Sequence, residues 1–531
     1  MSNKINRRDF IKSSLLTGAA LGAGVYNPLN SQVKSSFDTI ITNGKIYTGD
    51  GSEFISGSIG VKGGKITAIG EISSQADRII DARKLAVTPG FIDIHTHSDF
   101  TILKAPFGDS KIYQGVTTEV GGNCGESPYP SKSWKSIADF ESAISDLGAS
   151  INYKGLVGQG QIRSIVVGLD NVKPTKHQLE KMKSILENNL EEGAVGMSVG
   201  LEYAPSSFAN EDELVELCKV VAKHDKIFTV HMRNEDDRIF EALDEAINIA
   251  KRSGVRLQIS HLKTQYAENW GKAPEVLKKI ETAHREGVDI AFDRYPYTAF
   301  ATGLIVYIPI NDRQGTNSEI ISKLKDKNES ERISQYANQR IKRIGGPQNI
   351  VITHCNLEQN KKFIGKSIKE CADNLNMDYW EFIRTLLISE NGDVDIIGFA
   401  MNEDNLNLFL SHPLGMPASD GSIYSPVGEL SQNSPHPRSY GTFPRFLGRY
   451  VREKNILTLE EAIKRITFTP ASRLKLRDRG QIRIGYNADL VIFDPATILD
   501  NSDYSHPHTY PTGIDYVIVN GKVKLNKGIR G

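Results

Sequence analysis

The middle of the chain alternates amphipathic helical patterns with short apolar runs. Examples are "EDELVELCKVVAKH" before "KIFTVH", "FEALDEAINIAKRSG" before "VRLQISH", and "PEVLKKIETAHREG" before "VDIAFDRYPY". A helix that is followed each time by a β-rich run predicts a parallel sheet with helices outside it. The simplest way to close such a sheet over residues 89–470 is an α/β fold of the TIM type, a (β/α)8 barrel with insertions. An open doubly wound sheet is the alternative, although no GxGxxG motif follows a first strand.

The two ends of the chain have a different pattern. Residues 35–88 read as short β segments with hairpin-type turns at Asn43-Gly44 and Gly63-Gly64. The same pattern of short β segments and turns recurs within residues 471–531, in "ADLVIFDP" and "DYVIVNGKVKLN". We therefore expect a small β-sandwich domain that is built from both chain ends and flanks the barrel.

Residues 1–34 begin with a basic pair followed by a short apolar run, "NRRDFIKSSLLTGAALGAGV". Arg7 and Arg8 in this context resemble a twin-arginine export signal, which predicts recognition by the twin-arginine export machinery and a periplasmic or exported location. A basic helix start is the alternative. The apolar run is shorter than the roughly 20 residues that span a bilayer, and no cysteine follows it, so we expect no stable membrane anchor.

Composition narrows the class of ligand. The 531 residues include 64 basic and 64 acidic side chains, for a formal charge of zero. This balance gives no general electrostatic reason to expect nucleic-acid binding, and it favours a small-molecule substrate. The four cysteines are scattered and form no CxxC pair, so no disulfide can be assigned. Cys218 lies on an apolar helical face and is expected to pack in the core.

The stretch "PGFIDIHTHSDF" carries candidate metal ligands. His95 and His97 are two residues apart at the end of an apolar run, so in a strand both imidazoles project to the same side. Other polar residues also follow apolar runs, where a barrel places its reactive groups. A single strand-end histidine is more often structural, but the whole set predicts a metal site: His95, His97, Cys124, His231, His261 and the carboxylate Asp420.

The residue types indicate a hydrolytic reaction. Neutral imidazole and thiolate suit Zn²⁺, which with an open coordination position lowers the pKa of a bound water to about 7. Such a water can attack an amide carbonyl at neutral pH. Asp420 would accept its proton and deliver it to the leaving nitrogen, as general base and then general acid.

These residues carry a resemblance to a known family. "GFIDIHTHSD", the strand-end histidines and "SDG" resemble the amidohydrolase superfamily, and an ordered set of motifs resembles its N-acyl-D-amino-acid deacylase (D-aminoacylase) family. The motifs are "GGNCG", "GMSVGLEYAP", "HMRNE", "SHLK", "DRYPYTA", "ASDG" and "HPRSYGTFPR". The resemblance implies a zinc-dependent barrel hydrolase that cleaves the amide bond of N-acyl-D-amino acids or related D-residue dipeptides.

The resemblance also implies a ligand set. Cys124, His231 and His261 would form one tight zinc site, with the cysteine in place of the carboxylated lysine of many relatives. His95 and His97 would form a second, weaker site or hydrogen-bond near the first metal.

Substrate contacts follow by the same matching. Arg438 would pair with the free carboxylate of the substrate, for which a planar guanidinium is suited. Lys263 and Tyr295 match positions that contact this carboxylate or the scissile carbonyl. The chain departs from the family at Ala301, where a serine is common and only Thr302 supplies a nearby hydroxyl.

Two other functions remain open. A cyclic-amide hydrolase of the hydantoinase or dihydroorotase type would usually need a bridging carboxylated lysine, which the cysteine of "GGNCG" disfavours. A non-catalytic binding relic would usually have lost ligands or the acid, and none is missing. We interpret His354, which reads as closing the seventh strand, and His506 and His508 near the C-terminus as structural, and Glu202 as a group that orients a loop or ligand.

Overall fold

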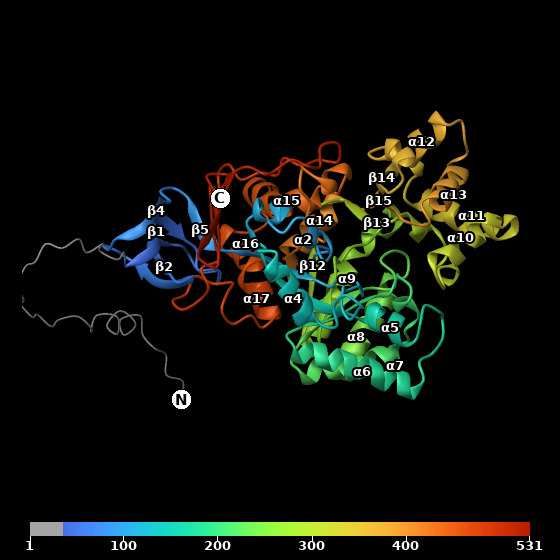
Figure 1. Ribbon diagram of the computed structural model, residues 1–531, viewed down its shortest axis with the longest axis horizontal. Coiled ribbons are helices and arrows are strands. Elements are labelled where there is room, and N and C mark those ends of the chain that lie inside the picture. Colours follow the sequence, from blue (N-terminus) through green and yellow to red (C-terminus); the bar gives the residue numbers. More distant parts are fainter. Residues whose placement is uncertain (1–35) are drawn as a thin grey trace, which may run out of the picture.

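The computed structural model describes residues 36–531, so the predicted export segment, residues 1–34, lies outside the described residues. Within the described part, no helix is both long and apolar enough to cross a membrane. Figure 1 shows a β-rich unit at one end of the molecule, a barrel with its helices in the middle, and a third region at the far end.

Eight parallel strands form the barrel, and this confirms the predicted fold over the open doubly wound sheet. Each strand pairs in parallel with the next, from β6 through β12 to β16. The strands are β6 (Phe91–Asp93), β7 (Val116–Gly121), β8 (Asn152–Gly158), β9 (Gly196–Gly200), β10 (Ile227–His231), β11 (Arg256–Ile259), β12 (Ile290–Arg294) and β16 (Gly415–Pro417).

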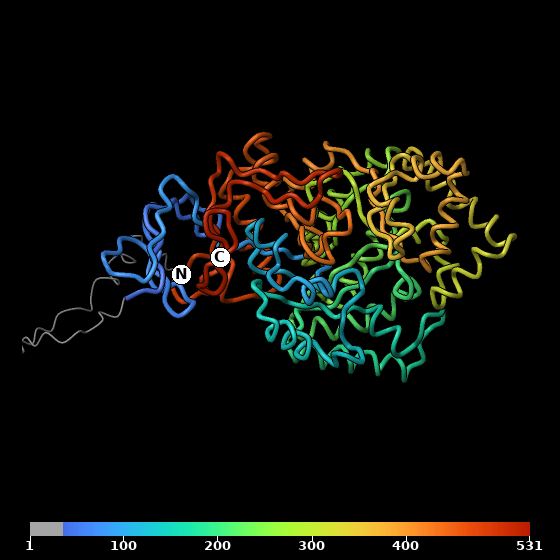
Figure 2. Tube along the Cα trace, turned by 45° about the horizontal axis from the view of Figure 1, so that its top comes forward, coloured from blue at the N-terminus to red at the C-terminus, as the bar shows by residue number. Residues whose placement is uncertain are grey.

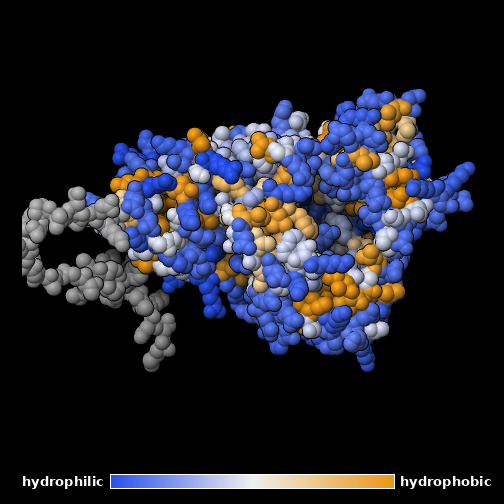
Figure 3. Space-filling view, in the orientation of Figure 1, coloured by the Kyte–Doolittle hydropathy of each residue, from blue (hydrophilic) through white to orange (hydrophobic). Residues whose placement is uncertain are grey.

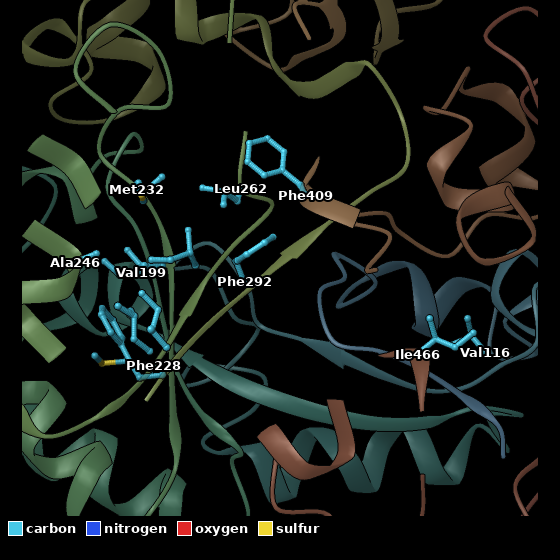
Figure 4. Packing of buried hydrophobic residues seen from close by; sticks show 14 of the residues in the cluster. Val116, Val199, Phe228, Met232, Ala246, Leu262, Phe292, Phe409 and Ile466 are labelled. Carbon is cyan, nitrogen blue, oxygen red and sulfur yellow. The ribbon is translucent and has the colours of Figure 1, made fainter. Parts of the chain in front are cut away.

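Amphipathic helices cover the outside of the strands. In α8 the apolar residues recur at helical spacing and are buried against the barrel, whereas the charged face is open to solvent. Figure 4 shows part of this core, including Val199 and Phe228 on barrel strands. The helices around the barrel are α2 (Thr101–Lys104), α3 (Asp109–Ile112), α4 (Ile137–Asp146), α5 (Gln159–Val166), α6 (Lys176–Glu191), α7 (Glu211–Lys223), α8 (Ile239–Ser253), α9 (Ala273–Arg285), α14 (Glu403–Ser411), α15 (Arg438–Arg445), α16 (Leu459–Ile466) and α17 (Phe468–Arg473).

Both chain ends contribute to one nine-stranded sheet, as predicted. The junction is β5 with β17, which run antiparallel with Val87 opposite Ile492. Figure 2 shows the N-terminal and C-terminal parts of the described chain side by side. The strands are β1 (Phe37–Ile46), β2 (Ile55–Lys62), β3 (Lys65–Gly70), β4 (Ala76–Asp81), β5 (Ala86–Pro89), β17 (Leu490–Phe493), β18 (Ile514–Val519), β19 (Lys522–Asn526) and β20 (Ile529–Arg530).

Residues 299–399, here called the insertion, separate the last two barrel strands and have an apolar core of their own. Three antiparallel strands, in the order β13, β15, β14, form its sheet. Its elements are β13 (Ala299–Gly303), α10 (Asn317–Lys325), α11 (Lys327–Arg343), β14 (Ile350–Cys355), α12 (Ile368–Asn374), α13 (Tyr379–Ser389) and β15 (Val394–Phe399).

The expectation that His354 closes the seventh barrel strand is wrong, because that strand is β12 and His354 lies on β14 of the insertion. A short apolar run looks the same in a parallel barrel and in an antiparallel sheet, so its pattern does not specify the partner strand. The structural interpretation of His354 agrees with its contact to Asn433, whose Oδ1 lies 2.9 Å from Nδ1.

A buried lysine joins the first and last barrel strands. Nζ of Lys111 is fully buried and donates to Asp93 Oδ2 at 2.9 Å, to Ser419 Oγ at 2.6 Å and to the carbonyl of Gly421 at 3.0 Å. The backbone N–H of Ser419 also donates to Asp93 Oδ1, at 2.8 Å. Beyond β6 and β16 the strand ends meet through an isolated bridge at Thr96 and Gly421. The lysine therefore ties the seam at which the barrel closes.

We expect Lys111→Met to destabilise the fold by about 3–5 kcal/mol, because it leaves the buried Asp93 carboxylate without its counter-charge. Urea and thermal unfolding midpoints measure the change. The matched control is Lys104→Met, since Lys104 forms an exposed pair with Glu429 at 2.7 Å and should contribute less than about 1 kcal/mol. Equal midpoints for the two variants would show that the seam does not depend on Lys111.

Candidate metal centre

Three predicted site residues lie in turns with an unusual backbone. Cys124 (φ 54°), His261 (φ 37°) and Asp420 (φ 51°) have left-handed conformations and follow the barrel strands β7, β11 and β16. Such conformations cost on the order of 1–3 kcal/mol each for residues other than glycine, and they persist where the surrounding structure enforces them. These turns direct the three side chains into the mouth of the barrel.

The thiol of Cys124 lies at the centre of three imidazoles. Its Sγ is 3.5 Å from His95 Nε2, 3.8 Å from His231 Nδ1 and 3.6 Å from His261 Nε2. Zinc–sulfur and zinc–nitrogen bonds of about 2.3 and 2.0–2.1 Å in a tetrahedron place S and N roughly 3.5 Å apart. The donor set and its spacing therefore fit a divalent metal ion, and all four side chains are buried.

A second group of possible ligands adjoins the first. Asp420 Oδ1 lies 3.0 Å from His97 Nε2 and 3.3 Å from His95 Nε2. His95 thus belongs both to the group with Cys124 and His261 and to the group with His97 and Asp420. The structure brings together all six residues that the sequence predicted for the site.

The electrostatics favour the ligand form of the cysteine. Burial opposes ionisation, but the charge of His95 and hydrogen bonds from His231 and His261 outweigh it and hold the pKa of Cys124 well below its usual range. The pKa of His231 is raised to about 10, because Glu235, Cys124 and Glu202 outweigh the effect of burial. A metal that binds here must displace protons, so its affinity rises with pH.

Carboxylates hold the far side of the imidazole rings. Asp293 Oδ1 lies 3.1 Å from His95 Nδ1, and Glu235 Oε1 lies 3.0 Å from His261 Nδ1. Such contacts fix which ring nitrogen faces the metal. We did not predict Asp293 and Glu235 as supporting residues. The signal was present, since Asp293 lies in "DRYPYTA" on β12 and Glu235 ends "HMRNE" after β10.

The imidazole of His231 contacts a carboxylate that the insertion holds in place. Glu202 Oε2 lies 3.3 Å from His231 Nε2, in agreement with the predicted orienting role of Glu202. Arg340, on α11, donates from both Nη1 and Nη2 to Glu202 Oε1 at 3.1 Å. Despite burial, chiefly Arg340 and then His231 lower the pKa of Glu202. A helix outside the barrel therefore holds the carboxylate that orients a candidate ligand.

Asp420 is ionised and positioned by an arginine. Arg438 Nη1 donates to Asp420 Oδ2 at 2.7 Å, while Oδ1 faces the histidines. Burial opposes ionisation, but Arg438 and then His95 lower the pKa of Asp420 well below its usual value. The carboxylate can therefore accept a proton at neutral pH.

A cavity of about 550 Å³ opens beside these groups and is lined by the predicted substrate residues Lys263, Tyr295 and Arg438. In Figure 3 the surface is hollowed between the barrel and the insertion. Nζ of Lys263 lies 2.6 Å from Glu235 Oε2. The hydroxyl of Tyr295 is buried and has no hydrogen-bond partner among residues 36–531. Cζ of the Arg438 guanidinium lies 4.8 Å from the centroid of the Tyr295 ring.

The remaining sequence candidates lie apart from the metal ligands or take other contacts. Asp99, two positions after His97, is not a predicted ligand; it accepts from Gly122 N at 2.7 Å and from the Tyr153 hydroxyl, so it braces a loop. His508 Nδ1 lies 2.9 Å from the Tyr440 hydroxyl, which agrees with a packing role. Thr302 lines the cavity, with its Oγ1 3.3 Å from the Tyr203 hydroxyl. The cysteines other than Cys124 are buried and unpaired within the described chain.

Known proteins resemble this chain over nearly its whole length. The amidohydrolase family profile (Amidohydro_3) matches residues 78–318 and 419–524, and the gap between them falls largely within the insertion. An N-acyl-D-glutamate deacylase of Alcaligenes xylosoxydans xylosoxydans is 32% identical over 506 residues, which cover 92% of this chain and 94% of that protein.

Solved structures give the same result. An N-acyl-D-glutamate deacylase from Bordetella bronchiseptica, in complex with zinc and a phosphonate mimic of the tetrahedral intermediate, matches with a TM-score of 0.80 and 31% identity, covering 92% of this chain and 96% of that one. A D-aminoacylase whose binuclear metal centre shows one-metal activation and second-metal attenuation matches with a TM-score of 0.78 and 30% identity, covering 93% and 98%.

We expect Arg340→Gln to weaken metal binding about 10–100-fold, because Glu202 loses the arginine that holds it against His231. Competition with a fluorescent zinc chelator measures the affinity. Lys342→Gln is the matched control, since Lys342 is an exposed residue of the same helix. Unchanged affinity in Arg340→Gln would mean that Glu202 is positioned without help from the insertion.

Proposed function

Because this chain belongs to the amidohydrolase family, and within it to the N-acyl-D-amino-acid deacylases (D-aminoacylases), we propose that it hydrolyses the amide bond of N-acyl-D-amino acids or of related dipeptides that end in a D-residue. The observation that carries the proposal is the buried Cys124–histidine cluster with Asp420 Oδ1 within 3.3 Å of His95. With a metal ion bound, these residues supply the ligands and the base that metal-assisted hydrolysis requires.

Zinc is the metal that we propose for this site. A thiolate with several imidazoles is a donor set that zinc favours. Cys124, His231 and His261 would hold the tight ion with His95 beside them, and His95, His97 and Asp420 a second, weaker one. When bound, the metal supplies a water of lowered pKa and polarises the substrate carbonyl.

The residues of the chain move the proton. Asp420 faces the histidines with Oδ1 and is kept ionised by Arg438 on Oδ2. It would take the proton of the attacking water at Oδ1 and then give it to the leaving nitrogen. The product pair is a carboxylate and a free D-amino acid.

Arg438, Lys263 and Tyr295 would bind the substrate carboxylate. Nη1 of Arg438 donates to Asp420. Within residues 36–531 the other N–H groups of this guanidinium donate no hydrogen bond. They are available for a carboxylate, and the unpartnered Tyr295 hydroxyl could donate to the same group or to the scissile carbonyl.

The cyclic-amide alternative is disfavoured by the structure. A carboxylated lysine would have to stand between the metal ligands, and here Cys124 lies at that place among the three imidazoles. The binding-relic alternative is disfavoured as well, because every predicted ligand and the acid are in place.

We also propose that the protein is exported to the periplasm by the twin-arginine machinery. The support is the sequence at Arg7 and Arg8 with the apolar run that follows. Cell fractionation of the wild type and of an Arg7→Lys/Arg8→Lys variant tests this, and equal cytoplasmic retention of both would contradict it.

The zinc-loaded enzyme is expected to release amine from N-acetyl-D-amino acids and not from their L enantiomers. Removal of the metal abolishes the activity, and Asp420→Asn lowers kcat by about 10²–10⁴-fold because the general base is lost. A fluorescent amine assay measures the product. Glu429→Gln, at an exposed carboxylate after the same barrel strand, should match the wild type. No release from any substrate with metal bound would favour cyclic amides.

Arg438→Gln is expected to raise KM and to move the acid limb of the pH–rate profile to higher pH. Arg438 lowers the pKa of Asp420, so its loss raises that pKa and protonates the carboxylate over a wider acidic range. Arg438→Lys keeps the charge and should restore the acid limb more than KM, because it lacks the planar fork. An unchanged profile with unchanged KM would contradict both roles of Arg438.

A further inference from the structure

Not every carboxylate that lines the cavity has a lysine or arginine beside it. Three of its carboxylates have a basic partner: Glu202 pairs with Arg340, Glu235 with Lys263, and Asp420 with Arg438, at 3.1, 2.6 and 2.7 Å. The other lining carboxylates have no lysine or arginine partner within residues 36–531, and they are Glu126, Asp393 and Asp395. These three are called the free acids below.

The free acids come from two sides of the cavity. Glu126 lies two positions beyond Cys124 in the loop after β7, and Asp395 lies on β15 of the insertion, opposite Gly303 of β13. Asp393 accepts a hydrogen bond from Asn356 at 2.7 Å, but the carboxylates of Glu126 and Asp395 accept none from the described residues. All three side chains are open to the cavity. A ligand can therefore reach them.

The free acids face the cavity as exposed side chains, and two of them, Asp393 and Asp395, are two positions apart at the start of β15. Like charges without a counter-charge are unfavourable, and a cation between them would relieve the repulsion.

The cavity is thus sorted by charge and holds a further sign of a ligand. Tyr295 is only 1% exposed, and its buried hydroxyl has no hydrogen-bond partner in the described chain. Its ring lies next to the Arg438 guanidinium. That end suits an anion. Asp393 and Asp395 lie in the part of the chain that the family profile does not match, whereas Glu126 lies within the matched residues.

We propose that the preferred substrates of this site carry a cationic group, a primary ammonium, which Glu126 and Asp395 bind with Asp393 beside them. The inference rests on the proposed deacylase function and specifies its substrate class. The ammonium has two possible sources: the free N-terminus of an aminoacyl-D-amino acid, or the side chain of an N-acyl-D-lysine. An acidic side chain would be repelled by the same groups.

Two substrate pairs test the proposal and distinguish the sources. Glycyl-D-alanine and N-propionyl-D-alanine have the same shape, with an ammonium in one and a methyl group in the other. N-acetyl-D-lysine and the N-acetyl derivative of D-2-aminoheptanoic acid differ in the same way at the side chain. For the zinc-loaded full chain we expect kcat/KM to favour the cationic member of one pair by about tenfold or more, the scale of one charge-assisted hydrogen bond. N-acetyl-D-glutamate should be the slowest substrate.

Variants connect the preference to the named residues. In Glu126→Gln/Asp395→Asn the ratio within the favoured pair should fall to about one, and added salt should weaken the wild-type ratio. The control is Asp373→Asn, an exposed carboxylate of the insertion that pairs with Lys369, and it should keep the wild-type ratio. The wild-type comparison stands by itself if the double variant fails to fold.

Two results would overturn the inference, and they are distinguishable. Equal rates within both pairs, with the D-series cleaved, would reject the cationic preference and leave the deacylase function intact. No free D-amino acid from any of the five substrates, with zinc shown to be bound, would reject the deacylase function and the inference with it.

Discussion

The closure of the barrel between its first and last strands is the constraint on which the site depends. His95 and His97 follow β6, whereas Asp420 follows β16, more than three hundred positions later in the sequence. The backbone N–H of Asp420 donates to the carbonyl of His95 at 2.8 Å. Lys111 also joins β6 to the residues that follow β16, through Asp93 and Ser419. The candidate base therefore meets the candidate ligands only when the seam is formed.

Around this seam the ligands are supported by carboxylates from different elements. Asp293 comes from a barrel strand, Glu235 from the loop after another strand, and Glu202 from a loop that Arg340 of the insertion holds. A metal ligand tolerates little reorientation, so such contacts largely determine affinity. The insertion consequently contributes to the metal centre as well as to the cavity wall.

The strand-end rule was sufficient to predict the metal cluster from the sequence, because the C-terminal ends of parallel strands meet on one face. His95, Cys124 and His261 followed from that rule alone. The rule could not predict Arg340, which reaches the site from a helix of the insertion, and it placed His354 on the wrong sheet. Supporting carboxylates such as Asp293 have no spacing of their own, since they are defined by contacts between strands. The substrate roles of Arg438 and Tyr295 came from family resemblance.

The sheet built from both chain ends has a consequence for the order of folding. Thr88 and Val491, which face each other across β5 and β17, are 403 positions apart. During synthesis the edge of β5 must stay unpaired until nearly the whole chain has left the ribosome, and strand β16 also arrives late. Exposed strand edges invite pairing with other chains. The nascent chain therefore carries an open strand edge that only the finished fold protects.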